Sequence, residues 1–574
     1  MPEPRETEKD VSEMLRPYMK RWIDPMVEGR ANPRIAAALL GFAMLVSLVY
    51  CLWATRGTTF SGDEMTWVAF SPSMDLKVAF EPHSGHLVVI SHLLYKFVLE
   101  TIGTNYVVFR LLTLLTVFLS VGLLFVYARK RVGPWIALAP CLVLLFFGSD
   151  TGHILQGNGF TIMLSIACGM LALISLDRET TAGDVVACLA LCLGVLTYTV
   201  ALPFLVGAVA VVLISRDRWK RIWVVAVPIL IYLGWRLWVQ TADIDITRGG
   251  IEPANIALLP AWTFQSLSGI LSALTGVHYN FTSNGWLPPG EMAGPALALI
   301  FVVAVGWRIS RGRLTSWFWV AIVIAVAMFA SQVLSWIPDV REPGTSRYLY
   351  PGVFVVLLIM IEAARGLRIT RSAFISIWLV ALTGFATNAV IIKSSGNALR
   401  DRTPAIQTEV TAASLLNSAG LYLPGPDAIP LADLVSEPPI SIVGSAEQKY
   451  GGLGLTEDEL EAAPPATRAQ VDAIMSAAFG FVLLPVEAPP VKSECKEEFG
   501  VEDEAIADMP RGGAALESKT GGTVKLRRFG DDFSINVGEL QPGVPMNLII
   551  PKDINSTPWQ VSVPANPLLV CPVS

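Results

Sequence analysis

Two adjacent carboxylates, Asp63 and Glu64, stand near the start of the loop 56–105, which lies between two apolar runs. Apolar residues return at once in the segment 67–70, so we expect the pair to lie in a cleft at a membrane surface. A carboxylate there can accept a proton from a hydroxyl group, because burial adjusts its pKa. We therefore predict catalytic roles for both acids. The alternative is ordinary solvation of an acid beside the end of a membrane span.

Two histidines, His83 and His86, lie farther along the same loop. The segment 86–98 spaces its apolar residues as one helical stripe, which predicts a helix lying in the membrane interface. Histidines at the start of such a helix can bind a phosphate, ligate a metal or hold a substrate. The alternative is two interfacial histidines with no specific role. No metal signature is present, although a divalent cation, Mg²⁺ or Mn²⁺, bound by Asp63 or Glu64 stays open.

Two further polar segments separate apolar runs. The segment 148–160 contains His153 and Gln156, which we predict to line the site opened by Asp63; loop polarity is the alternative. The segment 339–352 contains Arg341 and Arg347 on the expected outer side, against the usual distribution of positive charge. A guanidinium there suits a bidentate grip on a phosphate, and the alternative is simple snorkelling. The neighbouring Tyr348 is either a substrate contact or an aromatic-belt residue.

The composition of the chain that positions these residues indicates a polytopic membrane protein. It is 53% hydrophobic and only 16% charged, with a mean hydropathy of +0.54. No basic domain suited to nucleic acid is present. About eleven apolar runs fit the ~20-residue criterion for a membrane span: 35–55, 106–128, 134–148, 159–176, 184–198, 200–215, 222–240, 292–307, 316–336, 348–364 and 372–392.

Clusters of basic residues fall on one side of the membrane if there are eleven spans. The clusters are Arg129, Lys130 and Arg131; Arg216, Arg218, Lys220 and Arg221; Arg308, Arg311 and Arg313; and Arg365, Arg368 and Arg371. The positive-inside rule makes that side the cytoplasm. We therefore expect a cytoplasmic tail (1–34), a plasma-membrane region (35–395) with outer loops 56–105 and 241–291, and an extracytoplasmic domain (396–574).

The C-terminal region changes character. Helical spacing at 404–418 and 465–479, and short β-like runs after about 521, predict an α+β or β-rich domain. The segments 424–440 and 485–511, rich in Pro, Glu and Asp, are predicted loops or linkers. Cys495 and Cys571 are the two cysteines of this region, and an oxidising compartment would let them pair. Two unrelated free thiols are the alternative.

The order of these features resembles the GT-C class of glycosyltransferases that use polyprenyl-phosphate sugars. This class includes protein O-mannosyltransferases, lipid A aminoarabinose transferases and mycobacterial arabinosyltransferases. The resemblance rests on SGDEMTW (61–67), EPHSGHLVVISHLLYKFV (81–98), NYVVFRLLTLL (105–115) and SRYLYP (346–351), followed by many spans and an outer domain. The span count and this domain are most similar to actinobacterial cell-wall members.

The resemblance implies an inverting transfer of a sugar from a polyprenyl-phosphate donor to a hydroxyl of a cell-envelope glycan or glycolipid. Asp63 would be the general base, with Glu64 as its neighbour, and Arg347 or Arg341 would hold the donor phosphate. His83 and His86 stand where several relatives carry a second acid or other polar group, which leaves metal use and the donor open. We further expect Asp63 and Arg347 to meet at one pocket.

Two other functions stay open. A transporter or flippase of lipid-linked sugars would need polar residues deep within the spans, and the sequence offers few. A non-enzymatic scaffold would bind a polymer through the outer domain. No nucleotide-binding P-loop, G-x-S-x-G or H-E-x-x-H motif occurs.

Overall fold

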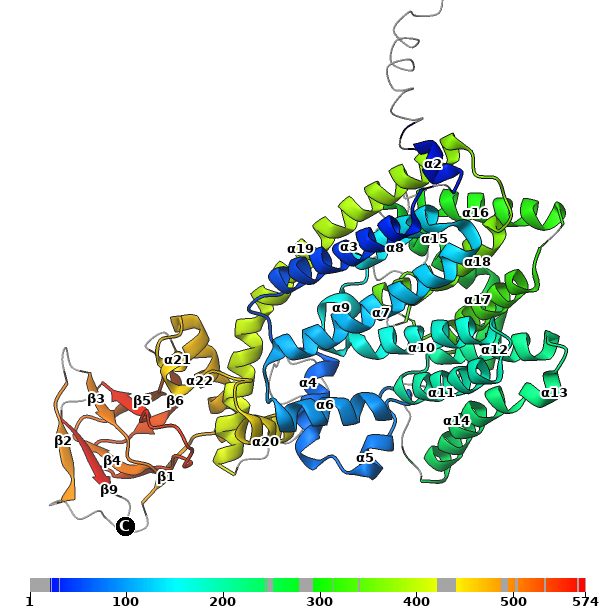
Figure 1. The fold of residues 1–574 in the computed structure, drawn as a ribbon. Helices are drawn as coiled ribbons and strands as arrows, with labels where there is room; N and C mark the ends of the chain where they lie inside the picture. Colours follow the sequence, from blue (N-terminus) through cyan, green and yellow to red (C-terminus); the bar gives the residue numbers. More distant parts are fainter. Residues whose placement is uncertain are drawn as a thin grey trace, which may run out of the picture. The chain divides into compact units, whose positions relative to one another are not determined.

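The protein is described here by a computed structural model, which forms two compact units. It describes residues 21, 23–29, 31–242, 244, 251–277, 293–312, 314–338, 341–420, 440–486, 494–500, 504–530, 533–564 and 567–572. The predicted tail 1–34 and loop 241–291 therefore lie partly outside the described residues. Unit 1 comprises Met1–Arg56, Asp75–Leu93 and Val107–Ala398; unit 2 comprises Gly57–Met74, Leu94–Tyr106 and Leu399–Ser574. Figure 1 labels most of their helices and strands.

Unit 1 is helical. Nine helical segments among the described residues are long and apolar enough to cross a membrane, and α8, α11 and α12 are shorter apolar helices. All eleven predicted runs are helices: α3 (Pro33–Ala54), α7 (Tyr106–Val132), α8 (Pro134–Leu145), α10 (Phe160–Leu176), α11 (Thr181–Thr197), α12 (Ala201–Ile214), α14 (Trp223–Thr241), α16 (Ala293–Ser310), α17 (Ser316–Leu334), α18 (Leu349–Ala364) and α19 (Arg371–Ser418). The predicted polytopic helical fold is confirmed.

Local signals begin several of these helices. Before α3, the Asn32 side chain accepts a hydrogen bond from the Arg34 N–H at 2.9 Å, and Pro33 occupies the first turn. Before α11, the Thr180 hydroxyl accepts from the Gly183 N–H at 3.1 Å. Such caps satisfy backbone N–H groups that have no partner within the helix.

Polar contacts define one end of the helical bundle, the Glu362 end. Glu362 is buried at the end of α18 and accepts hydrogen bonds from the Tyr127 hydroxyl (2.6 Å), the Thr315 hydroxyl (3.2 Å) and Arg131. Arg308 donates to the Ala363 carbonyl at 2.8 Å. Several predicted basic clusters therefore gather at this end.

The opposite end, the Asp150 end, is defined by polar contacts among the turn that follows α8, the start of α18 and the middle of α19. Asp150 accepts from the Tyr350 N–H at 3.2 Å, at the start of α18. Ser149 donates its N–H to the Asn388 side chain of α19 at 2.9 Å. Because α18 begins here and ends at Glu362, the two polar groups lie at opposite ends of the bundle.

One candidate span was not predicted: η4 (Pro253–Leu258) and α15 (Leu259–Thr275), which lie in the predicted loop 241–291. At the start, the Glu252 N–H donates to the Leu334 carbonyl, at the last residue of α17, at 2.9 Å. Near the end of α15, the Ala273 carbonyl accepts from Asn388 at 2.8 Å. Both contacts are at the Asp150 end, so the two ends of the segment formed by η4 and α15 lie at the same end of the bundle. The next helix, α16, ends near Arg308, at the Glu362 end.

Unit 2 holds short helices and two antiparallel sheets. Its helices include α4 (Asp63–Phe70), most of α6 (Val89–Thr101), α20 (Ile440–Tyr450), α21 (Glu457–Glu461) and α22 (Pro465–Phe479). One sheet has the order β1-β7-β4-β9-β2 and the other β3-β8-β5-β6. The strands are β1 (Leu483–Pro485), β2 (Lys496–Glu498), β3 (Ala505–Asp508), β4 (Ala514–Ser518), β5 (Gly522–Arg527), β6 (Ile535–Leu540), β7 (Met546–Leu548), β8 (Gln560–Val563) and β9 (Leu568–Pro572).

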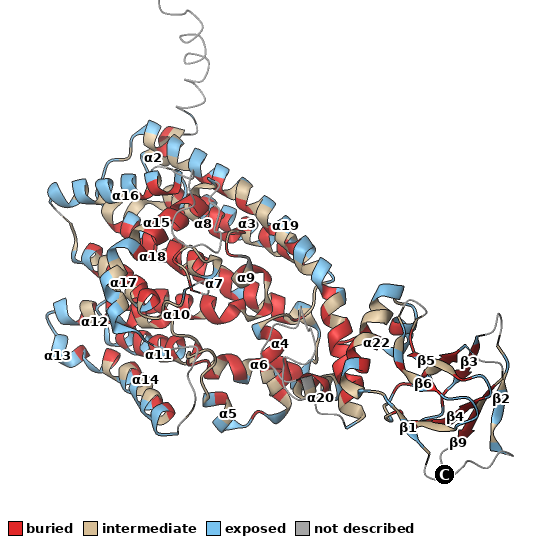
Figure 2. Cartoon of the chain, turned by 180° about the vertical axis from the view of Figure 1, so that it is seen from behind, coloured by how far each residue is buried: buried red, intermediate tan, exposed pale blue. Residues whose placement is uncertain are grey.

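The strand-rich part has its own apolar core. Leu516 of β4, Val561 of β8, Met475 of α22 and Leu416 of α19 are all fully buried in it. Figure 2 shows buried residues on the strands of both sheets. The predicted β-rich C-terminal domain is thus confirmed.

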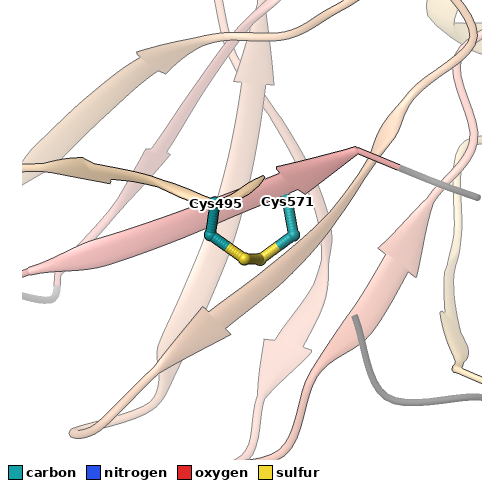
Figure 3. The surroundings of a disulfide bond; sticks show 2 residues. All are labelled: Cys495 and Cys571. Carbon is teal, nitrogen blue, oxygen red and sulfur yellow. A yellow bond between two sulfur atoms is a disulfide. The ribbon is translucent and has the colours of Figure 1, made fainter. Parts of the chain in front are cut away.

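A disulfide joins Cys495, just before β2, to Cys571 on β9 (Figure 3). The two strands pair antiparallel, and the neighbouring residues Lys496 and Val570 are partners in the register. The cysteines are therefore placed opposite each other across the sheet. They are the pair expected from the sequence.

Candidate functional site

Asp63 occupies the first position of helix α4 in unit 2. The preceding Gly62 has φ 58°, a left-handed conformation that glycine adopts without the strain of a side chain. This turn starts the helix with Asp63 exposed and Glu64 fully buried. The two predicted acids are therefore in different environments, although they are neighbours in sequence.

Glu64 is fixed from two sides. Its carboxylate accepts from the Tyr106 hydroxyl at 2.8 Å and from the Ser61 N–H at 3.4 Å. The Tyr106 ring packs edge-on against Phe60, with ring centroids 4.8 Å apart. A buried carboxylate needs such donors, so Glu64 holds the first turn of α4 in place.

Helix α20 packs against α4, a contact that the sequence did not predict. The Tyr450 hydroxyl lies 3.2 Å from the Ser71 hydroxyl and 3.1 Å from the Glu100 carboxylate. Lys449 pairs with Glu100 at 2.6 Å. The hydrogen bond from Lys449 lowers the pKa of Glu100. The C-terminal region therefore braces the helix that carries Asp63.

His83 and His86 belong to a tight turn in unit 1. Each donates its N–H to the other's carbonyl, at 3.1 and 2.9 Å, across Ser84 (φ 48°) and Gly85 (φ 83°). The two histidines pair with each other as an isolated β-bridge, and α6 begins at Val89, so both of them precede the helix and neither opens it. The His86 Nδ1 lies 2.7 Å from the Thr199 hydroxyl.

His92, one turn into α6, was not predicted as a site residue. It is 8% exposed, its Nδ1 lies 3.3 Å from the Ala79 carbonyl, and its ring centroid is 6.3 Å from that of His83. Burial lowers the pKa of His92 to about 4, with His83 adding to the effect. His92 is therefore neutral at physiological pH.

At the Asp150 end, Asp150 orients His153. Asp150 caps α9 (Thr151–Leu155) by accepting from the His153 N–H at 3.3 Å, and the His153 Nδ1 lies 2.8 Å from its carboxylate. Asp150 is fully buried, whereas the His153 side chain keeps 14% of its surface exposed. Gln156 follows α9, and its carbonyl accepts from the Thr113 hydroxyl at 3.0 Å.

Arg110, one turn into α7, also belongs to this end and was not predicted as a site residue. It is 1% exposed. It donates from Nη2 to the Ile154 carbonyl at 3.0 Å and from Nε to the Thr55 hydroxyl at 3.4 Å. The sequence signal that could have identified Arg110 is a charged residue inside an apolar run.

Arg341 and Arg347 differ in exposure. Arg341 is buried and donates to the Ser335 carbonyl at 3.3 Å. Arg347 is exposed, on η5 (Ser346–Tyr348), with its guanidinium 5.7 Å from the centroid of the Tyr348 ring. The turn η5 packs against α9. Asp63 and Arg347 belong to different units, and their meeting at one pocket stays a prediction.

Across the described residues, no group of three or more His, Cys, Asp or Glu side chains is placed to hold a metal ion. Asp63 and Glu64, the candidate ligands for Mg²⁺ or Mn²⁺, differ in exposure, and Glu64 is engaged by Tyr106. The residues present therefore do not form a ready divalent-cation site.

No known family model and no curated protein matches this sequence. Two solved structures of ArnT from Cupriavidus metallidurans, one bound to undecaprenyl phosphate and one in the apo state, are similar to it at 13% identity. Their TM-scores are 0.44 and 0.45, and the alignments cover 73% and 72% of this chain and 89% of each ArnT chain. Similarity at this level establishes neither the family nor the function of the chain.

Proposed function

We propose that this protein is an inverting, GT-C-like glycosyltransferase that moves a sugar from a polyprenyl-phosphate donor to a hydroxyl of a cell-envelope glycan or glycolipid. The observation that carries the proposal is the environment of Asp63, an exposed acid on the first turn of a helix whose next residue, Glu64, is buried and held by Tyr106. A carboxylate that is open to a substrate, on a fixed element, suits a general base.

In the proposed reaction, the Asp63 carboxylate takes the proton of the acceptor hydroxyl while that oxygen attacks the anomeric carbon. The bond from this carbon to the phosphate oxygen breaks, and polyprenyl phosphate leaves with the electron pair. Attack on the face opposite the leaving group inverts the anomeric centre. Arg347 or Arg341 balances the charge on the phosphate.

The remaining predicted contacts have supporting roles in this proposal. His83, His86, His153, Gln156 and Tyr348 bind the sugar, the phosphate or the acceptor. The Asp150 end faces the outside of the plasma membrane, and the N-terminus is cytoplasmic. The support for this orientation is the gathering of Arg131, Arg308 and Arg365 at the Glu362 end, in line with the positive-inside rule.

The test compares Asp63→Asn with a control in the same loop, Asp75→Asn. Asp75 is exposed and caps α5 (Leu76–Phe80) through the Val78 N–H at 2.8 Å, a bond that Asn can also accept. The full chain in lipid nanodiscs is given a panel of polyprenyl-phosphate sugars and hydroxyl acceptors. We expect D63N to lose product formation by about 100-fold or more, with D75N unchanged.

The same experiment separates the alternatives. Full activity of D63N would remove Asp63 from the mechanism. Movement of a lipid-linked sugar across proteoliposomes without a covalent product, in wild type, would favour a flippase. Polymer binding without either activity would favour a scaffold.

A further inference from the structure

We propose that Arg110 and the Asp150–His153 pair form a phosphate-binding site, which takes the phosphate group of the lipid donor or of the released polyprenyl phosphate. This inference rests on the proposed function and adds residues to it. All three residues belong to the Asp150 end of unit 1.

The first observation is the burial of Arg110. The guanidinium is 1% exposed, and its two hydrogen bonds go to neutral oxygens of Ile154 and Thr55. Among the described residues its Nη1 is buried with no hydrogen-bond partner, and neither of the two bonds made by the other nitrogens goes to a carboxylate. A buried charge without a counter-charge is costly. The site therefore favours an anion with acceptor oxygens.

The second observation is the orientation of His153. The His153 Nδ1 lies 2.8 Å from the carboxylate of the fully buried Asp150, and the Tyr350 N–H, which donates to the same carboxylate at 3.2 Å, holds that carboxylate in place. A carboxylate on Nδ1 holds the ring proton on that nitrogen and so sets the tautomer. The Nε2 atom is left on a ring that is partly exposed. It would donate to a phosphate oxygen in the imidazolium form and accept from a P–OH group in the neutral form.

These two groups come together through α9. Arg110 is bonded to the carbonyl of Ile154, the residue next to His153. The turn η5, which carries Arg347, packs against the same short helix. A guanidinium, an imidazole and a second guanidinium around one element suit a phosphate, since it offers several charged acceptor oxygens. A lipid phosphate also fits the position of Arg110, one turn into a candidate span.

The test measures lipid binding to the full chain in nanodiscs, with no sugar transfer needed. The probes are a polyprenyl phosphate, the matching polyprenol and inorganic phosphate. The variants are Arg110→Met, Arg110→Lys and His153→Gln, and the control is Arg129→Met. Arg129 lies on the same helix but is exposed at its far end, with its guanidinium 5.9 Å from the Phe125 ring centroid.

We expect R110M to weaken polyprenyl phosphate binding by about tenfold or more and to leave polyprenol binding unchanged. R129M should bind both as wild type does. Competition by inorganic phosphate that is lost in R110M would show that the site takes the phosphate group alone; no competition, with the lipid result intact, would show that it takes the lipid headgroup.

Equal affinity of wild type and R110M for polyprenyl phosphate would overturn the site. If R110M does not fold, R110K and H153Q test the site instead. If Arg110 and His153 have only structural roles, neither variant should change the preference for polyprenyl phosphate over polyprenol, and that result would overturn the site. A wild type that binds polyprenyl phosphate but transfers no sugar would leave this site standing and remove the proposed glycosyltransferase.

Discussion

At the scale of single residues, burial separates groups that the sequence presents as equivalent. Asp63 and Glu64 are both predicted site acids, yet only Asp63 is exposed. Glu64 instead depends on the Tyr106 hydroxyl, 2.8 Å away. Sequence periodicity cannot make this distinction, because it depends on a contact across 42 residues of chain.

Removing that hydroxyl tests the anchoring role of Glu64. In Tyr106→Phe, the buried carboxylate loses a donor, and we expect the free energy of unfolding to fall by about 1–3 kcal/mol. Thermal denaturation of the full chain measures this loss. Glu64→Gln and the double variant complete a mutant cycle, and a coupling energy near zero would show that the bond contributes nothing.

Asp472 of α22 makes the stability of the strand-rich domain depend on pH. Burial raises the pKa of Asp472 from 3.8 to about 6, although the Phe529 and Arg528 N–H groups donate to it. The pKa of Asp472 is higher in the folded than in the unfolded state, so folding favours its protonated form. The stability that the protonated carboxyl group contributes is complete below the unfolded pKa and is lost as pH rises through about 6.

Asp472→Asn should therefore remove one component of the pH dependence. Compared with wild type, the variant should gain stability on going from acidic to neutral pH, by up to about 3 kcal/mol. Hydrogen exchange of the β5–β6 hairpin in the full chain reports on this domain. A stability difference between the two proteins that does not change with pH would contradict the prediction.

At the scale of elements, Glu362 ties α7, α17 and α18 together through Tyr127, Thr315 and Arg131. Glu362→Ala leaves buried donors and a buried cation without their partner. We expect a loss of about 3–5 kcal/mol in the free energy of unfolding, measured by thermal denaturation in nanodiscs.

The matched control for this network is an exposed ion pair. Lys220 and Asp217 lie 3.5 Å apart with 84% and 69% of their side chains exposed. Asp217→Ala should change stability by less than about 1 kcal/mol. Equal losses in the two variants would show that the Glu362 network is no more important than a surface pair.

The elements that the sequence predicts are those with a strong local pattern. Apolar length located the eleven predicted runs, all of which are helices, and the short β-like runs after about 521 predicted β5 to β9. The prediction of a loop or linker over 485–511 was wrong in part, because this segment contains β2 and β3. Lys496–Glu498 has no strand pattern of its own and forms a strand through its pairing with β9. Helix α20 was missed for the same reason, since its packing on α4 is not local.

The residues of the candidate site likewise fall into two groups, those that the sequence points to and those that only the structure reveals. Asp63, His153 and Arg347 stand out in the sequence because they are polar residues beside apolar runs. Arg110 is visible only as a charge inside an apolar run and His92 only as a polar residue off the apolar stripe of its helix, whereas both matter through burial, at 1% and 8% exposure. Their recognition requires the neighbouring elements, which only the folded chain supplies.

At the scale of the whole molecule, the disulfide concerns one unit only. Cys495 and Cys571 close a loop with a sequence separation of 76 within the strand-rich domain. In the double variant Cys495→Ser and Cys571→Ser, we expect the free energy of unfolding of this domain to fall by about 2–4 kcal/mol. Hydrogen exchange should show faster opening of β4 and β9, with the helices of unit 1 unchanged; equal loss in both units would contradict this.

The other cysteines have a practical use. Cys51, Cys141, Cys168 and Cys188 are buried free thiols of the helical bundle, and Cys192 is partly so. A fluorogenic maleimide added to the native protein should therefore stay dark at the four buried thiols until the bundle melts. The remaining two sulfurs are joined to each other. Once the early reaction of Cys192 is subtracted as a baseline, the dye would record the melting of the bundle and needs no engineered label.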